Sequence, residues 1–291
     1  MTALGSESPR SGKLWIVATP IGNLDDLSPR AQQVLRDADL IAAEDTRHSA
    51  TLLRHIGSGA QTFALHEHNE REKSDELVRR LREGAQIALI SDAGTPLVSD
   101  PGYRLVRAAR AAGIAVSPVP GACAAIAALS AAGLPSDRFV FEGFLPARSA
   151  ARRAHLQTLA GETRTLVFYE SSHRIEECLR DCAQEFGGAR QGVLARELTK
   201  LYETILDGTL ADLSARVAAD ADQRRGEFVL LVAGADAGDA AEKLVQGRRV
   251  FEILRRELPP SRAAKLASEI TGAPRRMLYQ TERNSSEEDA N

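Results

Sequence analysis

The sequence predicts an α/β protein with two α/β domains followed by a small all-helical module. Short apolar runs alternate with helix-spaced segments through most of the chain, which is typical of sheets covered by helices. About ten such runs are too many for one twisted sheet, so we expect two sheets. The 291 residues suffice for two cores, with 43% hydrophobic and 26% charged residues. No apolar run approaches the roughly 18 to 20 residues of a membrane span.

The first domain is expected to cover residues 13–118. Residues 1–12 lack the apolar region of a signal peptide and are interpreted as a disordered leader. Helix signals separate the strands, as where Ser28 precedes a proline at the first helical position. The pattern breaks at PVPG (118–121), and the domain boundary is placed there. The five strands are expected at 14–18, 40–43, 62–65, 85–90 and 114–119.

A second series of strands predicts another sheet within a domain of residues 119–236. Cys178 and Cys182 are four residues apart in a helical pattern, and with Cys123 they lack zinc-ligand spacing. We interpret them as buried reduced thiols, which fits a protein of the reducing cytoplasm. The strands of this domain are expected at 139–144, 165–170, 192–197, 202–208 and 228–234.

The helical module is expected at residues 237–283, before a polar tail at 284–291. From Lys243 to Arg283 there are ten Lys or Arg against four Glu, a local charge of +6, so the remainder of the chain carries −9. An apolar helix face, the turn TGAP and a second helix outline a helix-turn-helix. Arg275 and Arg276 begin the second helix, where a nucleic-acid reader places contacts. A helical hairpin packed on its own domain remains an alternative. The expected apolar face comprises Ala264, Leu266, Ala267 and Ile270, and the second helix carries Met277 and Leu278.

Three turns of the chain suit a ligand that approaches the backbone closely. Ligands of open α/β sheets bind at the carboxyl ends of the strands. The turn SDAGTPLVSDPG (91–102) holds two glycines, two prolines and the carboxylates Asp92 and Asp100. TPIGNLDD (19–26) follows the first strand, and PGACAA (120–125) opens a helix with small residues. Neither a GxGxxG nor a GxxxxGK[ST] motif occurs, so the dinucleotide and P-loop fingerprints are missing.

Two further strand ends carry polar clusters. In AEDTR, Glu44 and Asp45 precede Arg47. Two interpretations remain open: the three residues form a substrate-handling cluster, or Asp45 or Thr46 caps the helix that follows. ALHEHN brings His66 to a strand end, and we expect this imidazole to face a substrate. His-x-Glu is half of a zinc deaminase signature, but the matching Pro-Cys-x-x-Cys is missing, so no metal is expected.

The ordered set of motifs resembles the ribosomal RNA small subunit methyltransferase I family, within the tetrapyrrole methylase superfamily. The resemblance covers residues 14–234 and extends to the LPPSRAAKLASEITG pattern of the helical module. One departure is PGACAA, where the family pattern is PGPCAA; Ala122 alters local stiffness more than chemistry. The matching motifs are TPIGNLDDLSPRA, IAAEDTRHS, FALHEHNE, SDAGTPLVSDPGYRLV, LSAAGLPSDRFVFEGFLP, FYESSHRI and RELTKLYET.

The resemblance implies 2′-O-methylation of a cytidine ribose in the decoding centre of 16S rRNA, in the 30S subunit. It also implies a homodimer and a cleft between two α/β domains that binds S-adenosylmethionine. A ribose hydroxyl needs a general base, for which Asp45, His66 and Asp100 are the candidates, with Arg47 positioning a phosphate or polarising the acceptor. The implied cofactor-binding residues are Thr19, Pro20, Gly22, Asp92, Ala93, Gly94, Thr95, Pro96, Leu97, Val98, Gly121, Ala122, Cys123, Ala124, Tyr169, Arg196 and Phe228.

RNA contacts are expected from basic residues because phosphate contacts dominate affinity. Aromatic residues make up only 4% of the chain, so a run of stacked bases is not the expected mode, and splaying out a single base fits better. The alternatives are a tetrapyrrole (precorrin-type) C-methyltransferase, which does not need the basic module, and a helix-turn-helix regulator, which leaves the glycine-rich turns unexplained. The candidate RNA-binding residues are Arg148, Arg152, Arg153, Arg275 and Arg276.

Overall fold

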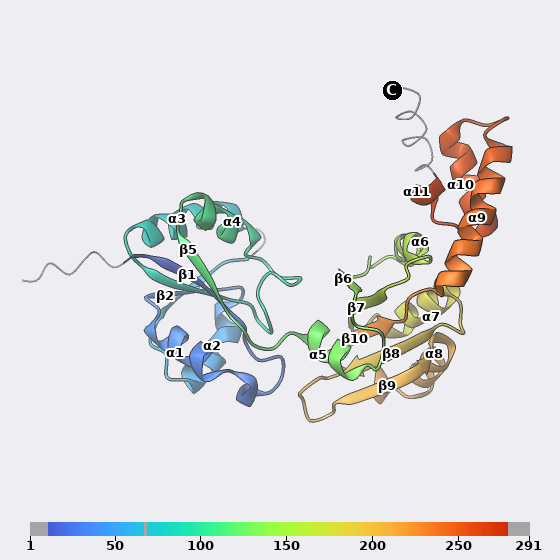
Figure 1. Cartoon of the computed structure of the whole chain (residues 1–291). Helices are drawn as coiled ribbons and strands as arrows, with labels where there is room; N and C mark the ends of the chain where they lie inside the picture. Colours follow the sequence, from blue (N-terminus) through green and yellow to red (C-terminus); the bar gives the residue numbers. More distant parts are fainter. Residues whose placement is uncertain (1–10, 67–68, 279–291) are drawn as a thin grey trace, which may run out of the picture. The chain divides into compact units, whose positions relative to one another are not determined.

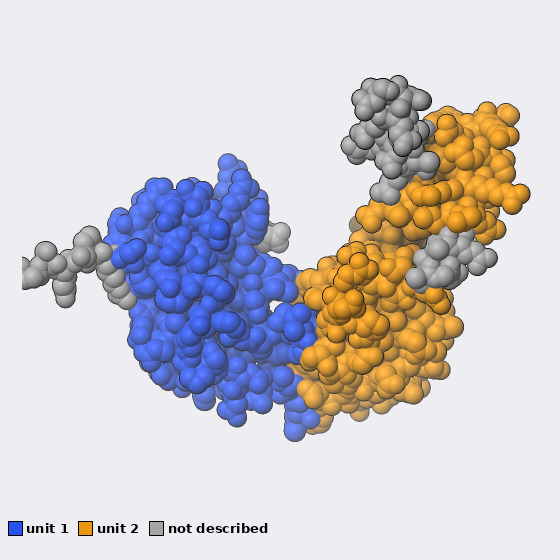
Figure 2. Space-filling view, viewed as in Figure 1, with its two compact units in different colours: residues 1–127, 199–201 blue, residues 128–198, 202–291 orange. Residues whose placement is uncertain are grey.

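The computed structural model describes residues 11–66 and 69–278, and only the backbone of residues 237–242. Most of the expected leader and the whole polar tail therefore lie outside the described residues. The chain forms two compact units (Figure 2). Unit 1 comprises the chain up to Ala127 together with Thr199–Leu201, and unit 2 comprises Ala128–Leu198 and the chain from Tyr202 onward. Among the described residues, no helix is both long and apolar enough to span a bilayer.

Unit 1 is built on a five-stranded sheet in the order β3-β2-β4-β1-β5, in which every neighbouring pair is parallel. Parallel strands bury both faces, and the apolar runs of the sequence reflect this. The strands are β1 (Lys13–Val17), β2 (Leu40–Ala43), β3 (Gln61–Ala64), β4 (Gln86–Ile90) and β5 (Ala115–Val119).

Helices cover both faces of this sheet (Figure 1). Apolar side chains of α1 and α2 pack on one face, with Leu35 and Leu53 in that core. Those of α3 and α4 pack on the other face, with Leu77 and Leu105. Ser28 caps α1 as its sequence position predicts, because its hydroxyl accepts a hydrogen bond from the Ala31 amide. The helices are α1 (Pro29–Asp37), α2 (Thr46–His55), α3 (Glu70–Arg82) and α4 (Tyr103–Ala111), with the short 3-10 helix η1 (Leu24–Asp26) before α1.

Unit 2 contains the second five-stranded sheet, in the order β6-β7-β10-β8-β9. Only β6 and β7 pair in parallel, and the other neighbours are antiparallel. The prediction of two α/β sheets is confirmed. The strands are β6 (Phe139–Phe144), β7 (Thr165–Ser171), β8 (Gln191–Arg196), β9 (Thr204–Thr209) and β10 (Glu227–Val232).

One face of the second sheet packs against three helices. Leu156, Leu179 and Leu213, one from each helix, meet Phe168 and Leu230 of the sheet in a single core. Cys178 and Cys182 are buried in the same core as free thiols, as predicted. The helices are α6 (Ser149–Leu159), α7 (Ile175–Phe186) and α8 (Leu210–Ala219). The chain passes from the first sheet to the second through α5 (Ala124–Ala131), and η2 (Asp222–Arg224) precedes β10.

The described part of the C-terminal module consists of α9 (Ala237–Leu254), α10 (Pro260–Thr271) and the short helix α11 (Arg275–Leu278). The turn after α10 begins at Gly272, whose φ of 71° is left-handed and suits glycine. Ala264 and Ala267 of the expected apolar face are buried, and Leu278 joins them. The expectation for Ile270 is wrong: this side chain is 64% exposed, because the core-facing side of α10 ends on Thr271 instead.

Candidate active site

The three ligand-type turns of unit 1 contact one another at the carboxyl end of its sheet. Thr19 and Gly94 exchange backbone hydrogen bonds of 2.8 and 3.1 Å, which join the first turn to the SDAGTPLVSDPG turn. The Thr95 hydroxyl donates to the Ala122 carbonyl at 2.9 Å, which joins that turn to PGACAA. The structure therefore brings together the three segments of unit 1 that the sequence assigned to a cofactor.

Backbone conformation in these turns explains their composition. Gly94 has a φ of 83°, and a Cβ on Gly121 lies 2.9 Å from the Ala18 Cβ, so that both positions exclude larger residues. Leu97 and Ser99 adopt φ values of 72° and 67°, although neither is glycine. Residues held in this region cluster at ligand-binding and catalytic sites. The strain lies within the turn that carries both carboxylates.

Carboxylates converge where β2 and β4 end. The Asp45 amide donates to Asp92 Oδ1 at 3.1 Å. Burial, together with the negative charge of Asp92, raises the pKa of Asp100 to about 6, although a hydrogen bond from Ser91 opposes the shift. Burial and the charges of Asp100 and Asp92 also raise the pKa of Glu44. Glu44 belongs to this cluster but was not among the candidate bases predicted from the sequence. The adjacent acids of AEDTR were the available signal.

The pKa of Asp45 is shifted in the opposite direction. Its carboxylate accepts from the Arg47 amide at 2.8 Å and forms an ion pair of 2.9 Å with the Arg47 guanidinium. Hydrogen bonds from the side chain and backbone of Arg47 lower the pKa of Asp45 to about 2. Asp45 is the N-cap of α2, so the capping alternative describes its position. Such a carboxylate accepts a proton poorly near neutral pH.

His66 lies in the exposed turn after β3, at the same edge of the sheet. Its amide donates to the Asn69 side chain at 2.9 Å, and its carbonyl accepts from the Asn69 and Glu70 amides. This turn begins α3. His68, the other histidine of the motif, lies outside the described residues.

The three candidates of unit 2 do not share one face of the sheet. Phe228 pairs with Glu170 on β7 and with Arg196 on β8, which places these residues in one row on the helix-covered face. Tyr169 lies in the next row, on the opposite face. Phe228 is 3% exposed within the core, so its assignment to a cofactor wall is corrected to a core position.

Arg196 has a structural role on the helix-covered face. Its guanidinium donates to the carbonyls of Arg225 and Tyr202 at 2.7 and 2.9 Å. These bonds fasten the end of β8 to two neighbouring loops.

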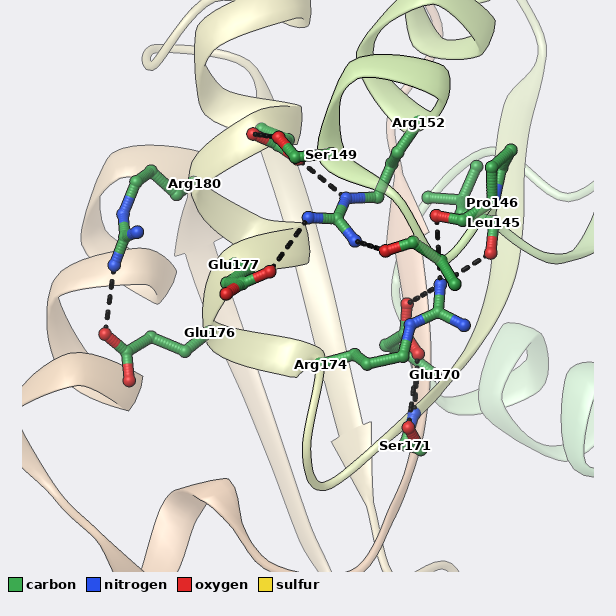
Figure 3. Close-up of polar contacts among 12 residues, drawn as sticks. Leu145, Pro146, Ser149, Arg152, Glu170, Ser171, Arg174, Glu176, Glu177 and Arg180 are labelled. Atoms are coloured by element: carbon green, nitrogen blue, oxygen red, sulfur yellow. Dashed lines mark hydrogen bonds and ion pairs between the residues drawn. The ribbon is translucent and has the colours of Figure 1, made fainter.

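The candidate RNA-binding arginines divide by exposure. Arg148, Arg275 and Arg276 are exposed. Arg153 is half-buried in an ion pair with Glu185. Arg152 is wrong as an RNA contact, because its side chain is fully buried and its Nε donates to Asp181 at 2.7 Å (Figure 3).

Comparison with known proteins decides the family. Family models match the Tetrapyrrole (Corrin/Porphyrin) Methylases over residues 13–214 and the RsmI C-terminal HTH domain over residues 241–281. Ribosomal RNA small subunit methyltransferase I of Xylella fastidiosa (strain Temecula1) is 62% identical over 268 residues, which cover 92% of this chain and 98% of that protein. The chain belongs to the ribosomal RNA small subunit methyltransferase I family. The resemblance seen in the sequence is confirmed, and the chain is an enzyme of the methyltransferase class.

Other members of the ribosomal RNA small subunit methyltransferase I family align equally broadly. The Pseudomonas aeruginosa protein is 58% identical over 93% of this chain and 96% of its own length, and the Escherichia coli O157:H7 protein is 54% identical over 92% and 93%. The helix-turn-helix outline of the C-terminal module agrees with the second family model.

Solved structures show that this member of the ribosomal RNA small subunit methyltransferase I family has the tetrapyrrole methylase fold. The methyltransferase CobJ is 22% identical with a TM-score of 0.58, covering 77% of this chain and 95% of that chain. Cobalt precorrin-4 methyltransferase is 19% identical with a TM-score of 0.55, covering 76% and 94%. Uroporphyrin-III C-methyltransferase from Thermus thermophilus, solved with S-adenosylhomocysteine, is 18% identical with a TM-score of 0.51, covering 76% and 97%. Within the described part of this chain, no three His, Cys, Asp or Glu side chains form a metal-type cluster.

Proposed function

We propose that this enzyme transfers the methyl group of S-adenosylmethionine to the ribose 2′-hydroxyl of a cytidine in the decoding centre of 16S rRNA, within the 30S subunit. The observation that carries the proposal is the contact among three turns of unit 1 beside carboxylates of raised pKa. The name of the relatives, which specifies the RNA of the small ribosomal subunit, supports the choice of acceptor.

The three turns fit the chemistry of the donor. S-adenosylmethionine presents an adenine face, a ribose diol, an amino-acid head and a sulfonium, and it supplies an electrophilic methyl group. Gly94 and Gly121 let the backbones of the turns pack closely against their neighbours, and the Asp92 carboxylate suits hydroxyl or ammonium groups. Within unit 1, the donor site would be formed by Thr19, Pro20, Gly22, residues 92–98 and residues 121–124.

Methyl transfer requires an in-line approach of the acceptor oxygen, so alignment supplies much of the rate. The ribose hydroxyl is a weak acid, and a base must take its proton as the new C–O bond forms. Asp100 is the base that the electrostatics favour, with Glu44 beside it. Asp45 is held ionised by Arg47 and is better suited to keep that arginine in place for a phosphate.

RNA would be held by exposed arginines of unit 2. Arg148 lies at the start of α6, and Arg275 and Arg276 lie at the start of α11. The positive charge of the C-terminal module matches an RNA partner. We further infer a cytoplasmic homodimer, whose mass in solution can be measured by light scattering.

The decisive experiment measures tritiated methyl transfer from S-adenosylmethionine to 30S subunits from a strain that lacks this modification. Incorporation at the 2′-oxygen of a single decoding-centre cytidine supports the proposal. Transfer to precorrin substrates without transfer to 30S subunits contradicts it, as does methylation of a base carbon or nitrogen. Crystals soaked with S-adenosylhomocysteine test the donor residues, and a ligand found away from the three turns contradicts their assignment.

A further inference from the structure

An aromatic cluster lies at the β6 edge of the second sheet, on the face opposite the core formed with α6, α7 and α8. The Tyr169 ring meets Phe141 and Phe144 edge to face, with ring centroids 5.0 and 5.6 Å apart. Phe144 is 56% exposed. A single exposed apolar side chain needs no explanation. This ring, however, is placed by two specific features of the fold.

The first feature is a bulge in β6. Residues three apart in a regular strand lie on opposite faces of a sheet. The β6–β7 register shifts between Phe141 and Gly143, so that Phe141 pairs with Val167 and Phe144 with Tyr169. Both phenylalanines therefore lie on the face of Tyr169. Bulges frequently re-aim a side chain beside a functional site.

The second feature is the anchoring of the loop that follows Phe144. Three consecutive carbonyls of this loop accept hydrogen bonds from arginines (Figure 3). Arg174 Nη2 donates to the carbonyls of Leu145 and Pro146, and Arg152 Nη1 donates to that of Ala147 at 3.4 Å. The loop is thus held in position by the protein itself, which lowers the entropy cost of binding a ligand there.

The charges of these two arginines are compensated internally. Arg152 pairs with Asp181 at 2.7 Å, and Arg174 pairs with Glu170 at 3.1 Å. Arg148, at the end of the same loop, is exposed, and no carboxylate pairs with it among the residues that the structure describes. The segment from Phe144 to Arg148 therefore carries one exposed aromatic ring and one exposed cation, four residues apart. An aromatic ring beside a cation matches a nucleotide, which offers a base and a phosphate.

We propose that Phe144 stacks on the base of a nucleotide that is splayed out of the RNA substrate, while Arg148 contacts a flanking phosphate. This inference rests on the proposed function. A nucleotide base has an aromatic face that can stack on the exposed Phe144 ring. Stacking of a single base needs only one such ring, which a chain with 4% aromatic residues can supply.

The test uses the full chain, 30S subunits that lack the modification, and three substitutions of Phe144. Phe144→Ala and Phe144→Leu are expected to raise the KM for 30S subunits by about 10-fold or more, because one stacked base is lost. Phe144→Tyr, which keeps an aromatic ring, is expected to stay within about threefold of the wild type. The Kd for S-adenosylhomocysteine, measured by calorimetry, is expected to change less than twofold in all three variants.

Phe139→Ala is the matched control. Phe139 is 37% exposed and begins the same strand, two residues before Phe141 on the same face. Its replacement is expected to leave the KM for 30S subunits and the Kd for S-adenosylhomocysteine near wild-type values.

Three outcomes would overturn the stacking proposal: equal KM values for Phe144→Ala and Phe139→Ala, a weakened S-adenosylhomocysteine affinity that assigns the ring to the donor, or a change in oligomeric mass that assigns it to a second copy of the chain. A wild-type enzyme that does not methylate 30S subunits contradicts the proposed function instead, so the two failures are distinguishable.

Discussion

Two aspartates that follow neighbouring strands of unit 1 have pKa values shifted in opposite directions. Asp45 accepts hydrogen bonds from the backbone and side chain of Arg47, which stabilise its charged form. Asp100 is half-buried beside Asp92, which destabilises its charge. Environments that separate the pKa values of paired acids identify their separate roles in acid–base chemistry. Here they favour Asp100 for proton transfer and Asp45 for holding Arg47.

The raised pKa of Asp100 predicts opposite pH dependences for activity and stability. Its pKa rises from 3.8 to about 6 on folding, so the folded state binds the extra proton and its contribution to stability, complete below pH 3.8, is lost as the pH rises through about 6. The shift corresponds to about 3 kcal/mol, which screening at a half-exposed site reduces to about 1 kcal/mol. Asp100→Asn is expected to be more stable than the wild type by about 1 kcal/mol at pH 7.5 and equal to it near pH 4.

Urea unfolding at several pH values measures this difference. In the same series, the rate of methyl transfer by the wild type is expected to rise as the pH passes through about 6, and Asp100→Asn is expected to lose about 100-fold or more in kcat. A variant that retains wild-type turnover removes Asp100 from the mechanism.

Arg152 predicts a large effect on stability without a direct role in RNA binding. Its side chain is fully buried and pairs with Asp181, which is 9% exposed. Arg152→Met leaves that carboxylate unpaired and is expected to cost about 3–5 kcal/mol of unfolding free energy. Arg180→Met, which breaks an exposed pair with Glu176, is expected to cost less than about 1 kcal/mol. Urea denaturation compares the two variants, and equal losses would contradict the buried-pair interpretation.

The side-chain environment of Arg152 was the harder part to predict from sequence. Arg152 and Arg153 are adjacent and chemically identical in AARRAH. Their positions on the helix differ. Arg152 lies four residues before the buried Leu156 and three after Ser149, so these three residues share the buried helix face, and Ser149 also bonds Asp181. The cap at Asp45, in contrast, depends on neighbours in sequence and could be anticipated.

At the scale of elements, all ten strands lie where the sequence predicts them, and the apolar runs of the central strands β2 and β4 reflect burial on both faces. The bulge in β6 could not be derived in this way. FVFEGF reads as a regular strand, and only its register against β7 shows that the residue between Phe141 and Gly143 is unpaired. Gly143, with a φ of 63°, was the one local signal.

Glu70 links two helices of unit 1 and yields a prediction at this scale. It is 6% exposed, and its Oε1 accepts from the Gly102 and Arg104 amides at 3.1 and 2.6 Å, which satisfies the start of α4. Glu70→Ala is expected to lower the unfolding free energy by about 1–3 kcal/mol. It is also expected to weaken S-adenosylhomocysteine binding, because α4 follows the SDAGTPLVSDPG turn directly.

Glu70→Gln is the matched variant, since its amide oxygen can still accept a hydrogen bond. We expect it to recover at least half of the lost stability and affinity, as measured by urea unfolding and calorimetry. If Gln and Ala behave alike, the two amide contacts do not determine the position of the turn.

At the scale of the whole molecule, charge is divided between the segment from Lys243 to Arg283, at +6, and the rest of the chain, at −9. The double substitution Arg275→Gln, Arg276→Gln is expected to weaken binding to 30S subunits. It is expected to reduce the slope of log Kd against log salt concentration by about 1.5 to 2, as for two lost phosphate contacts. Filter binding between low and physiological salt measures the slope.

Arg180→Gln is the control for this measurement, because it removes an exposed positive charge that is already paired with Glu176. It is expected to leave the slope unchanged, and both proteins are expected to bind S-adenosylhomocysteine like the wild type. A double variant whose slope equals that of the control excludes Arg275 and Arg276 from RNA contact.

The strand order of unit 1 has a consequence for the synthesis of the protein. β1 lies between β4 and β5 and pairs with residues 86–89 and 115–119, both of which follow it in the chain. These two partners lie roughly 70 and 100 residues further along the chain, so they leave the ribosome well after β1, and long-range parallel pairing forms slowly. In a nascent chain stalled before β5, one edge of the apolar strand β1 has no hydrogen-bonding partner. Such an exposed strand edge favours aggregation or chaperone binding. Stalled chains that expose residues up to 110 are expected to be cleaved by protease in unit 1, whereas chains that expose residue 130 are expected to resist.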